Sequence, residues 1–163
     1  MQPLITCLWF DGEAEAAAKF YVSLFPNSKL GAVTPYPSDI EGKKAGEVMT
    51  VDFELNGQKF VGLNGGPEFR FSEAISFQIP CENQAEIDRY WNAFVQGGGE
   101  ESVCGWCKDR FGLSWQVIPK DLPKLLSPAD PAKAKRVSDA FLKMRKLDIA
   151  AIKAAADAAP ERV

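Results

Sequence analysis

The chain has 163 residues, of which 46% are hydrophobic and 25% are charged, and its formal net charge at pH 7 is -3. This length is enough for one domain with a hydrophobic core, and the slight acidity argues against a nucleic-acid partner, which normally selects a basic surface. The count of histidine is zero, which excludes imidazole as a metal ligand, as a general base and as the partner of a serine or cysteine nucleophile.

The cysteines and the hydropathy pattern indicate the compartment. Cys7, Cys81, Cys104 and Cys107 lie in apolar, strand-like contexts, which is typical of reduced thiols and not of a secreted disulfide framework. No apolar run is long enough to span a bilayer. We therefore expect a cytoplasmic protein without a membrane partner.

The first half of the chain predicts a strand, a helix and three further strands, at residues 5–10, 14–25, 30–34, 47–55 and 58–63. Asp11 is expected to cap the helix, because aspartate at this position accepts a backbone N–H bond. The dipeptide Asn56-Gly57 is a strong hairpin signal between the last two strands. The apolar stripe expected on the helix consists of Ala17, Phe20, Tyr21 and Leu24.

The same order of elements returns in the second half, at residues 74–79, 83–95, 101–103, 105–108 and 113–118. An offset of 70 residues aligns Ile5 with Ile75 and Thr6 with Ser76, and residues 57–61 match residues 112–116. Such a repeat predicts two β-α-β-β-β units. The expected fold is α+β, with two curled sheets around a cup and helices on their outer faces.

We expect residues 1–163 to form a single domain, with unit one at about 4–64, unit two at about 74–119 and a helical extension at about 121–158. The extension shows Val137, Phe141 and Met144 at helical spacing, and Asp148 can cap a final alanine-rich helix over residues 149–158. This apolar stripe either packs against its own domain or seals a homodimer, and the sequence leaves both open. A homodimer is our expected assembly.

Several motifs resemble one protein family. They are LWFDG at 8–12, FPNS at 25–28, LNGGP at 63–67, EAISF at 73–77, GGEES at 98–102 and the run from CGWC at 104–107 to SWQ at 114–116. Together with the repeat they resemble the PhnB-like branch of the vicinal-oxygen-chelate superfamily, which includes glyoxalase I, extradiol dioxygenases and the fosfomycin- and bleomycin-resistance proteins. This branch is often labelled "3-demethylubiquinone-9 3-methyltransferase domain", and the likeness extends from about residue 4 to about residue 119.

The resemblance implies a divalent metal held by histidine and glutamate on the first and last strands of each unit. The corresponding positions are Leu4, Val61, Ala74 and Gln116. Of these only Gln116 has a donor atom, a neutral amide oxygen, which is a poor replacement for a carboxylate. We therefore expect no metal and no other cofactor. The methyltransferase label is unsupported, because no glycine-rich loop joins a strand to a helix in a doubly wound pattern.

Alternation along the strands predicts which side chains line the cup. The ligand-binding candidates are Thr6, Lys59, Ser76, Gln78, Cys107, Ser114 and Gln116, with Leu8 and Val61 on the same face. The opposite set, expected under the helices, is Ile5, Cys7, Phe60, Ile75, Phe77, Trp115 and Val117. Cys107 joins the cup if the hairpin pairs Lys108 with Leu113, which also puts Trp106 beside Trp115 under the helix. A merely solvated sheet face is the alternative.

These observations favour a metal-independent protein that binds a small molecule in the cup. One alternative is a glyoxalase-like lyase, isomerase or dioxygenase with a relocated metal on carboxylates such as Glu68 or Glu101. Another is a thiol redox protein that uses Cys104 and Cys107, although residues three apart on a strand face opposite sides. We interpret this pair as structural cysteines, and Asp109 and Arg110 as residues of the hairpin turn.

Overall fold

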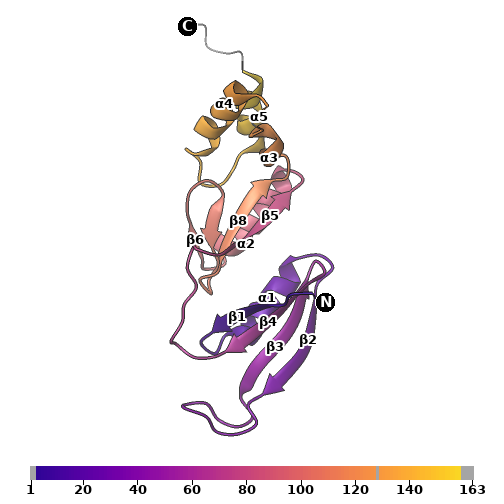
Figure 1. Ribbon diagram of the computed structural model, residues 1–163, viewed down its shortest axis with the longest axis vertical. Helices are drawn as coiled ribbons and strands as arrows, with labels where there is room; N and C mark the ends of the chain where they lie inside the picture. The colour runs from indigo at the N-terminus through magenta and orange to yellow at the C-terminus, as the bar shows by residue number, and fades with distance from the viewer. Residues whose placement is uncertain (1–2, 128, 159–163) are drawn as a thin grey trace. The chain divides into compact units, whose positions relative to one another are not determined.

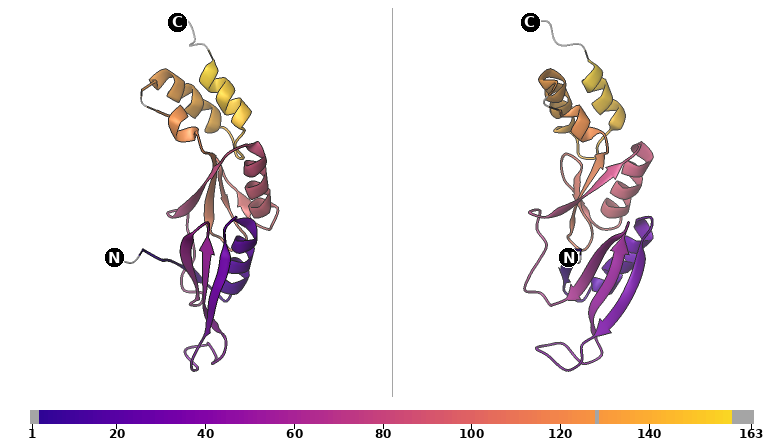
Figure 2. Two further views of the ribbon diagram at one scale, coloured as in Figure 1. Left: turned by 90° about the vertical axis from the view of Figure 1, so that its right-hand side faces the viewer. Right: turned by 45° about the vertical axis from the view of Figure 1, so that its right-hand side comes forward.

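In a computed structural model of the chain, residues 3–127 and 129–158 are described. These residues divide into two compact units, with the boundary between Phe71 and Ser72. Each unit contains a four-stranded sheet with one helix packed on one of its faces (Figure 1, Figure 2). The predicted α+β fold of two β-α-β-β-β units is confirmed. None of the described helices is both long and apolar enough to cross a membrane.

The first unit contains β1 (Thr6–Phe10), α1 (Ala14–Leu24), β2 (Lys29–Pro35), β3 (Val48–Leu55) and β4 (Gln58–Asn64). Its sheet has the order β1-β4-β3-β2. The β1–β4 pair is parallel and the other two pairs are antiparallel. Parallel strands need a crossover connection, and α1 is the helical part of the connection that leads from β1 towards β4.

Small residues let α1 lie close against this sheet. Ala14, Ala17, Ala18 and Tyr21 are fully buried, and a Cβ atom on Gly62 would lie 3.1 Å from the Ala14 Cβ. The sequence predicts that Asp11 caps the first turn of this helix, and this prediction is wrong. The N-cap residue is Glu13, whose side chain makes no capping bond.

The capping acceptor for α1 comes instead from the distant strand β4. The Ala14 N–H donates to the Asn64 side-chain oxygen over 2.9 Å. Because the free N–H groups of a first helical turn need an acceptor, Asn64 replaces the local cap and ties α1 to β4.

The second unit repeats this order with β5 (Ser76–Cys81), α2 (Gln84–Val95), β6 (Glu100–Glu101), β7 (Trp106–Lys108) and β8 (Ser114–Pro119). Its sheet order is β5-β8-β7-β6, and β5–β8 is the parallel pair. The predicted apolar face of α2 is confirmed, since its buried residues are Ile87, Tyr90, Trp91 and Phe94. The Phe94 ring stacks on the Trp115 ring of β8 at 4.8 Å between centroids.

The C-terminal extension contains α3 (Leu122–Leu125), α4 (Pro131–Phe141) and α5 (Ile149–Asp157). Its helices pack on one another and on the end of the second unit (Figure 2). The Cys104 and Gly105 N–H groups donate to the carbonyls of Met144 and Arg145, each over 2.8 Å, and Leu147 is buried. These contacts hold the extension against its own unit, while a homodimer sealed by the stripe of Val137, Phe141 and Met144 stays a prediction. Asp148 caps α5 as expected, accepting from the Ala151 N–H over 3.0 Å.

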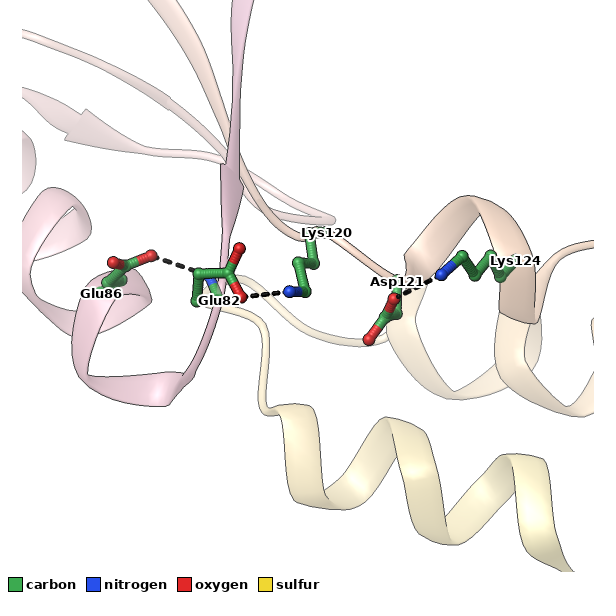
Figure 3. Close-up of polar contacts among 5 residues, drawn as sticks. All are labelled: Glu82, Glu86, Lys120, Asp121 and Lys124. Atoms are coloured by element: carbon green, nitrogen blue, oxygen red, sulfur yellow. Dashed lines mark hydrogen bonds and ion pairs between the residues drawn. The ribbon is translucent and has the colours of Figure 1, made fainter.

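A cluster of charged residues marks the junction between β8 and the extension (Figure 3). Lys120 forms an ion pair with Glu82, which precedes α2, and Lys124 reaches Asp121 over 3.4 Å. Glu86 accepts a hydrogen bond from the Glu82 N–H over 2.7 Å. Because these side chains are largely exposed, each ion pair contributes little to stability.

The register of β1 corrects the predicted cup face in the first unit. Thr6 pairs with Phe60 and Leu8 pairs with Gly62, so Thr6 and Leu8 share the helix-covered face with the buried Phe60 ring. Cys7 pairs with Val61 on the other face. The prediction for Thr6, Leu8 and Cys7 was wrong by one residue, and in a strand a slip of one residue moves every side chain to the opposite face.

The hairpin in the second unit is also shifted by one residue from its predicted register. Lys108 pairs with Ser114, Cys107 with Trp115 and Trp106 with Gln116. Cys107 therefore lies under α2 and not in the predicted cup, while Trp106 lies on the opposite face. The turn is the reason, because the Asp109 N–H donates to the Leu113 carbonyl over 3.0 Å. Leu113 is thus opposite Asp109 and not opposite Lys108. Each residue of β7 therefore pairs one position further along β8 than predicted.

Candidate functional site

The face of the second sheet opposite α2 presents polar side chains on adjacent strands. We call this set the open face, and it consists of Ser76 and Gln78 on β5, Trp106 and Lys108 on β7, and Ser114 and Gln116 on β8. The pairings Ser76–Ser114 and Gln78–Gln116 place the first and last strands in register. All four predicted candidates on β5 and β8 thus share one face, because paired residues in a sheet point to the same side.

Three of these side chains form a hydrogen-bonded row. The Gln116 amide nitrogen donates to the Ser76 hydroxyl over 2.8 Å. The Gln78 amide nitrogen donates to the Gln116 oxygen over 3.2 Å. Gln116 is therefore the centre of the row, and it is held in one orientation by a neighbour on each end. Amide groups fixed in this way can offer their remaining donors and acceptors to a bound molecule.

Ser114 differs from its neighbours on the open face. Its side chain is buried, at 1% exposure, and its hydroxyl has no hydrogen-bond partner among the described residues. Leaving a buried hydroxyl unsatisfied costs about 1–3 kcal/mol. Native structures contain few such groups, and each of them needs an explanation.

A hollow of about 130 Å³ lies next to Ser114. Its lining residues are Glu73, Glu100, Glu101, Ser102, Trp106, Cys107, Lys108 and Ser114. Lys108 forms an ion pair with Glu73, and the hydrogen bond between them lowers the pKa of the Glu73 carboxyl and raises the pKa of Lys108. Arg145 reaches the Glu101 carboxylate over 3.0 Å. The hollow therefore combines an unsatisfied hydroxyl, an indole ring and charged groups.

The first unit has a separate and larger hollow of its own, with a volume of about 260 Å³. Its lining residues are Ile5, Lys29, Gly31, Asp52, Phe53, Glu54, Lys59, Phe60 and Val61. Lys59 faces Glu54 across β3 and β4, and Lys29 reaches Glu54 over 3.4 Å. Thr6 lies outside this hollow and accepts a hydrogen bond from Gln58 over 3.5 Å. Of these two predicted site residues, Lys59 therefore lines the hollow and Thr6 lies on the opposite face of the same sheet.

The residues at the expected metal positions do not fit a divalent metal. Leu4 is 95% exposed. Val61 lies between Cys7 and Asp52, and Gln116 lies between Gln78 and Trp106. Asp52 is the one carboxylate among these neighbours, and no imidazole joins it, so the donor set of the superfamily site is absent at these positions. Within residues 3–127 and 129–158 no group of three or more cysteine, aspartate or glutamate side chains could hold a metal ion.

The cysteines do not have the environment of a redox pair. Burial raises the pKa of the Cys107 thiol to about 12, with a smaller contribution from the Asp109 charge. Burial also raises the pKa of Cys81 to about 12. A redox-active thiol needs a lowered pKa, because the thiolate is the nucleophile.

Alkylation tests this difference among the thiols. With iodoacetamide at pH 8, we expect the exposed Cys7 to react first, and Cys81 and Cys107 to stay unmodified in the native protein, because less than about 0.1% of each is thiolate. Peptide mass mapping of the labelled protein measures the order. Rapid labelling of Cys107 would contradict the buried position and revive the thiol redox alternative.

Comparisons with known proteins agree with this architecture. Two β-α-β-β-β units, each with a helix on one face of its sheet, define a fold that solved proteins share. A family model described as 3-demethylubiquinone-9 3-methyltransferase matches residues 2–118. A solved PhnB protein from Bacillus cereus is 32% identical with a TM-score of 0.64, and the match covers 72% of this chain and 99% of that one. The chain therefore belongs to this PhnB-like family, and the resemblance seen in the sequence is confirmed.

A second solved structure, a protein from Pseudomonas aeruginosa, is 20% identical with a TM-score of 0.58, and the match covers 71% of this chain and 95% of that one. It supports the fold alone. A comparison with curated proteins gave no match. The helices α3, α4 and α5 lie beyond residue 118, the last residue matched by the family model.

Proposed function

We propose that the open face of the second unit binds a small organic molecule and that it does so without a metal. The observation that supports this most directly is the buried, unsatisfied hydroxyl of Ser114 beside a hollow. The row formed by Gln78, Gln116 and Ser76 adds fixed amide groups on the same face. A hollow with a few oriented polar groups is the usual form of a small-molecule site.

The alternatives have less support. A glyoxalase-like enzyme with a relocated metal would need a carboxylate cluster around Glu68 or Glu101, but Glu101 is paired with Arg145. Methyl transfer, the activity in the family label, normally uses a doubly wound parallel sheet to hold its cofactor, whereas each sheet here has one parallel pair. We therefore treat the label as a family name.

The proposal predicts that Gln116→Ala weakens ligand binding by at least about tenfold, because it removes the amide that orients both neighbours. The measurement is a small-fragment screen by protein-observed NMR, which follows the four indole N–H resonances and is repeated on the variant. Gln96→Ala is the matched control, since Gln96 is exposed at the C-terminal end of α2. Fragments that bind both variants equally would contradict a site on the open face.

We also propose that the protein acts in the cytoplasm as a homodimer. The four cysteines are free thiols, which fits a reducing compartment. Strand β2 is at the edge of its sheet and all seven of its residues are exposed, and an unprotected edge favours pairing with a second copy. Light scattering of the purified protein measures the assembly, and a monomer mass at about 100 μM would contradict the dimer.

A further inference from the structure

We infer that the hollow beside Ser114 selects small ligands that carry both a protonated primary amine and, a few bonds away, a hydroxyl or carbonyl oxygen. This inference rests on the proposed function, because it concerns the same open face and names the class of molecule that the face takes.

The charges of the lining residues favour a cation. Glu73 is occupied by Lys108 and Glu101 by Arg145. Glu100 faces Lys108 across β6 and β7, and its charge contributes to the raised pKa of Lys108. Glu100 forms no direct ion pair within 4.0 Å among the described residues. One carboxylate of the hollow is therefore without a direct cationic contact, and an ammonium group is the complementary ligand.

Ser114 and Trp106 specify the kind of cation. An ammonium group has three N–H donors and no acceptor, whereas a hydroxyl can both donate and accept. The Ser114 hydroxyl can accept one ammonium hydrogen and donate its own hydrogen to a neighbouring oxygen of the ligand. Trp106 lies on the same face and is only half-buried, and the face of an indole ring attracts cations. These contacts need both the amine and the oxygen.

The size of the hollow limits the ligand. A volume of about 130 Å³ is close to that of a cavity that holds one benzene molecule, so about six to eight non-hydrogen atoms fill it. The ligand is therefore a small amino alcohol or amino carbonyl compound, or one arm of a larger molecule that extends along the row of Gln116 and Gln78.

Three probes of similar length, each small enough to enter the hollow, differ mainly in charge. They are 3-aminopropan-1-ol, propane-1,3-diol and 3-hydroxypropanoate, which carry a positive charge, no charge and a negative charge. The titration follows the Trp106 indole N–H resonance, assigned with Trp106→Phe. We expect the amine to bind with a Kd of about 1–10 mM, the diol to bind at least about fivefold more weakly and the anion not to bind.

Two variants assign the contacts. Glu100→Gln is expected to reduce amine affinity about fivefold or more and to remove the preference over the diol. Its control is Glu82→Gln, which removes an equal charge from an exposed residue outside the hollow and should leave binding unchanged. Ser114→Ala is expected to weaken amine binding and, because an unsatisfied group disappears, to raise the melting temperature by about 2–4 °C.

The outcomes separate this inference from the proposed function. If the diol or the anion binds as tightly as the amine, and Gln116→Ala weakens binding by at least about tenfold, the face is a binding site and the inference about the amine is wrong. If no probe binds at about 50 mM, or if Glu100→Gln and Ser114→Ala both bind the amine like the native protein, the inference is also overturned. The proposed function fails only if fragments bind the native protein and Gln116→Ala equally well.

Discussion

Replacing Asp109 by alanine is expected to destabilise the second unit by about 3 kcal/mol, because its buried carboxylate satisfies three N–H donors, of which two are buried and one is partly buried. Asp109 is 3% exposed. One of its oxygens accepts from the backbone N–H groups of Phe111 and Leu113, over 2.9 and 3.1 Å. The other accepts from the Trp115 indole N–H over 2.8 Å. The variant leaves all three donors without this acceptor in the interior.

Urea unfolding followed by tryptophan fluorescence measures this loss, since Trp91, Trp106 and Trp115 belong to the second unit. Asp109→Asn keeps an acceptor for the turn but puts an NH₂ group or a neutral oxygen against the indole. It should therefore lower the free energy of unfolding by about half as much as Asp109→Ala. Asp139→Ala removes the same charge from an exposed residue of α4 and should change stability by less than about 1 kcal/mol. A loss below about 1 kcal/mol for Asp109→Ala would show that water replaces the carboxylate.

The same residue explains why the hairpin register was not predicted from sequence. Alternation identified the strand that became β8 and placed Ser114 and Gln116 on one face, which the structure bears out. Alternation within one strand cannot tell which residues of two strands are paired. That depends on the turn, where Asp109 closes the loop on Leu113, and the resulting slip moved Cys107 and Trp106 to the faces opposite to those predicted.

The error in β1 has a similar local cause. The helices of the two units align at an offset of 70, since α1 begins at Ala14 and α2 at Gln84. The strands before them align at 71, because β1 ends at Phe10 and β5 at Cys81. The first unit therefore has one extra residue between strand and helix, in a link that contains Gly12 at a φ of +87°. A single insertion of this kind reverses the predicted faces of a whole strand.

The charged part of the site could not be predicted from local patterns. Ser76, Gln78, Ser114 and Gln116 follow from alternation and from the repeat. Glu73 and Glu100 look like surface charges in the sequence, because their relation to Ser114 depends on strands brought together by folding. The corrected hairpin register was the missing signal, since it places Lys108 next to Ser114 and so brings the Lys108–Glu73 pair to the same face.

Asn64→Ala is expected to destabilise the first unit by about 2–3 kcal/mol. Asn64 is 6% exposed. Its side-chain oxygen accepts from the Ala14 N–H over 2.9 Å, and its amide nitrogen donates to the Val48 carbonyl over 3.0 Å. The variant therefore removes the cap of α1 and the bond to β3 together. Its backbone carbonyl also accepts from the Tyr36 hydroxyl over 2.5 Å, and this bond remains in the variant.

Two conservative variants divide that effect between the helix and the strand. Asn64→Asp keeps the acceptor for Ala14 and loses the donor to Val48, so the first turn of α1 should stay protected from amide exchange. Tyr36→Phe loses only the bond to the Asn64 carbonyl and should cost about 1 kcal/mol. Unfolding of the first unit is followed through Trp9, its one tryptophan in the sequence. If Asn64→Ala exposes only the first turn of α1 and leaves the unfolding midpoint unchanged, the cap is local and β4 does not couple the helix to the rest of the unit.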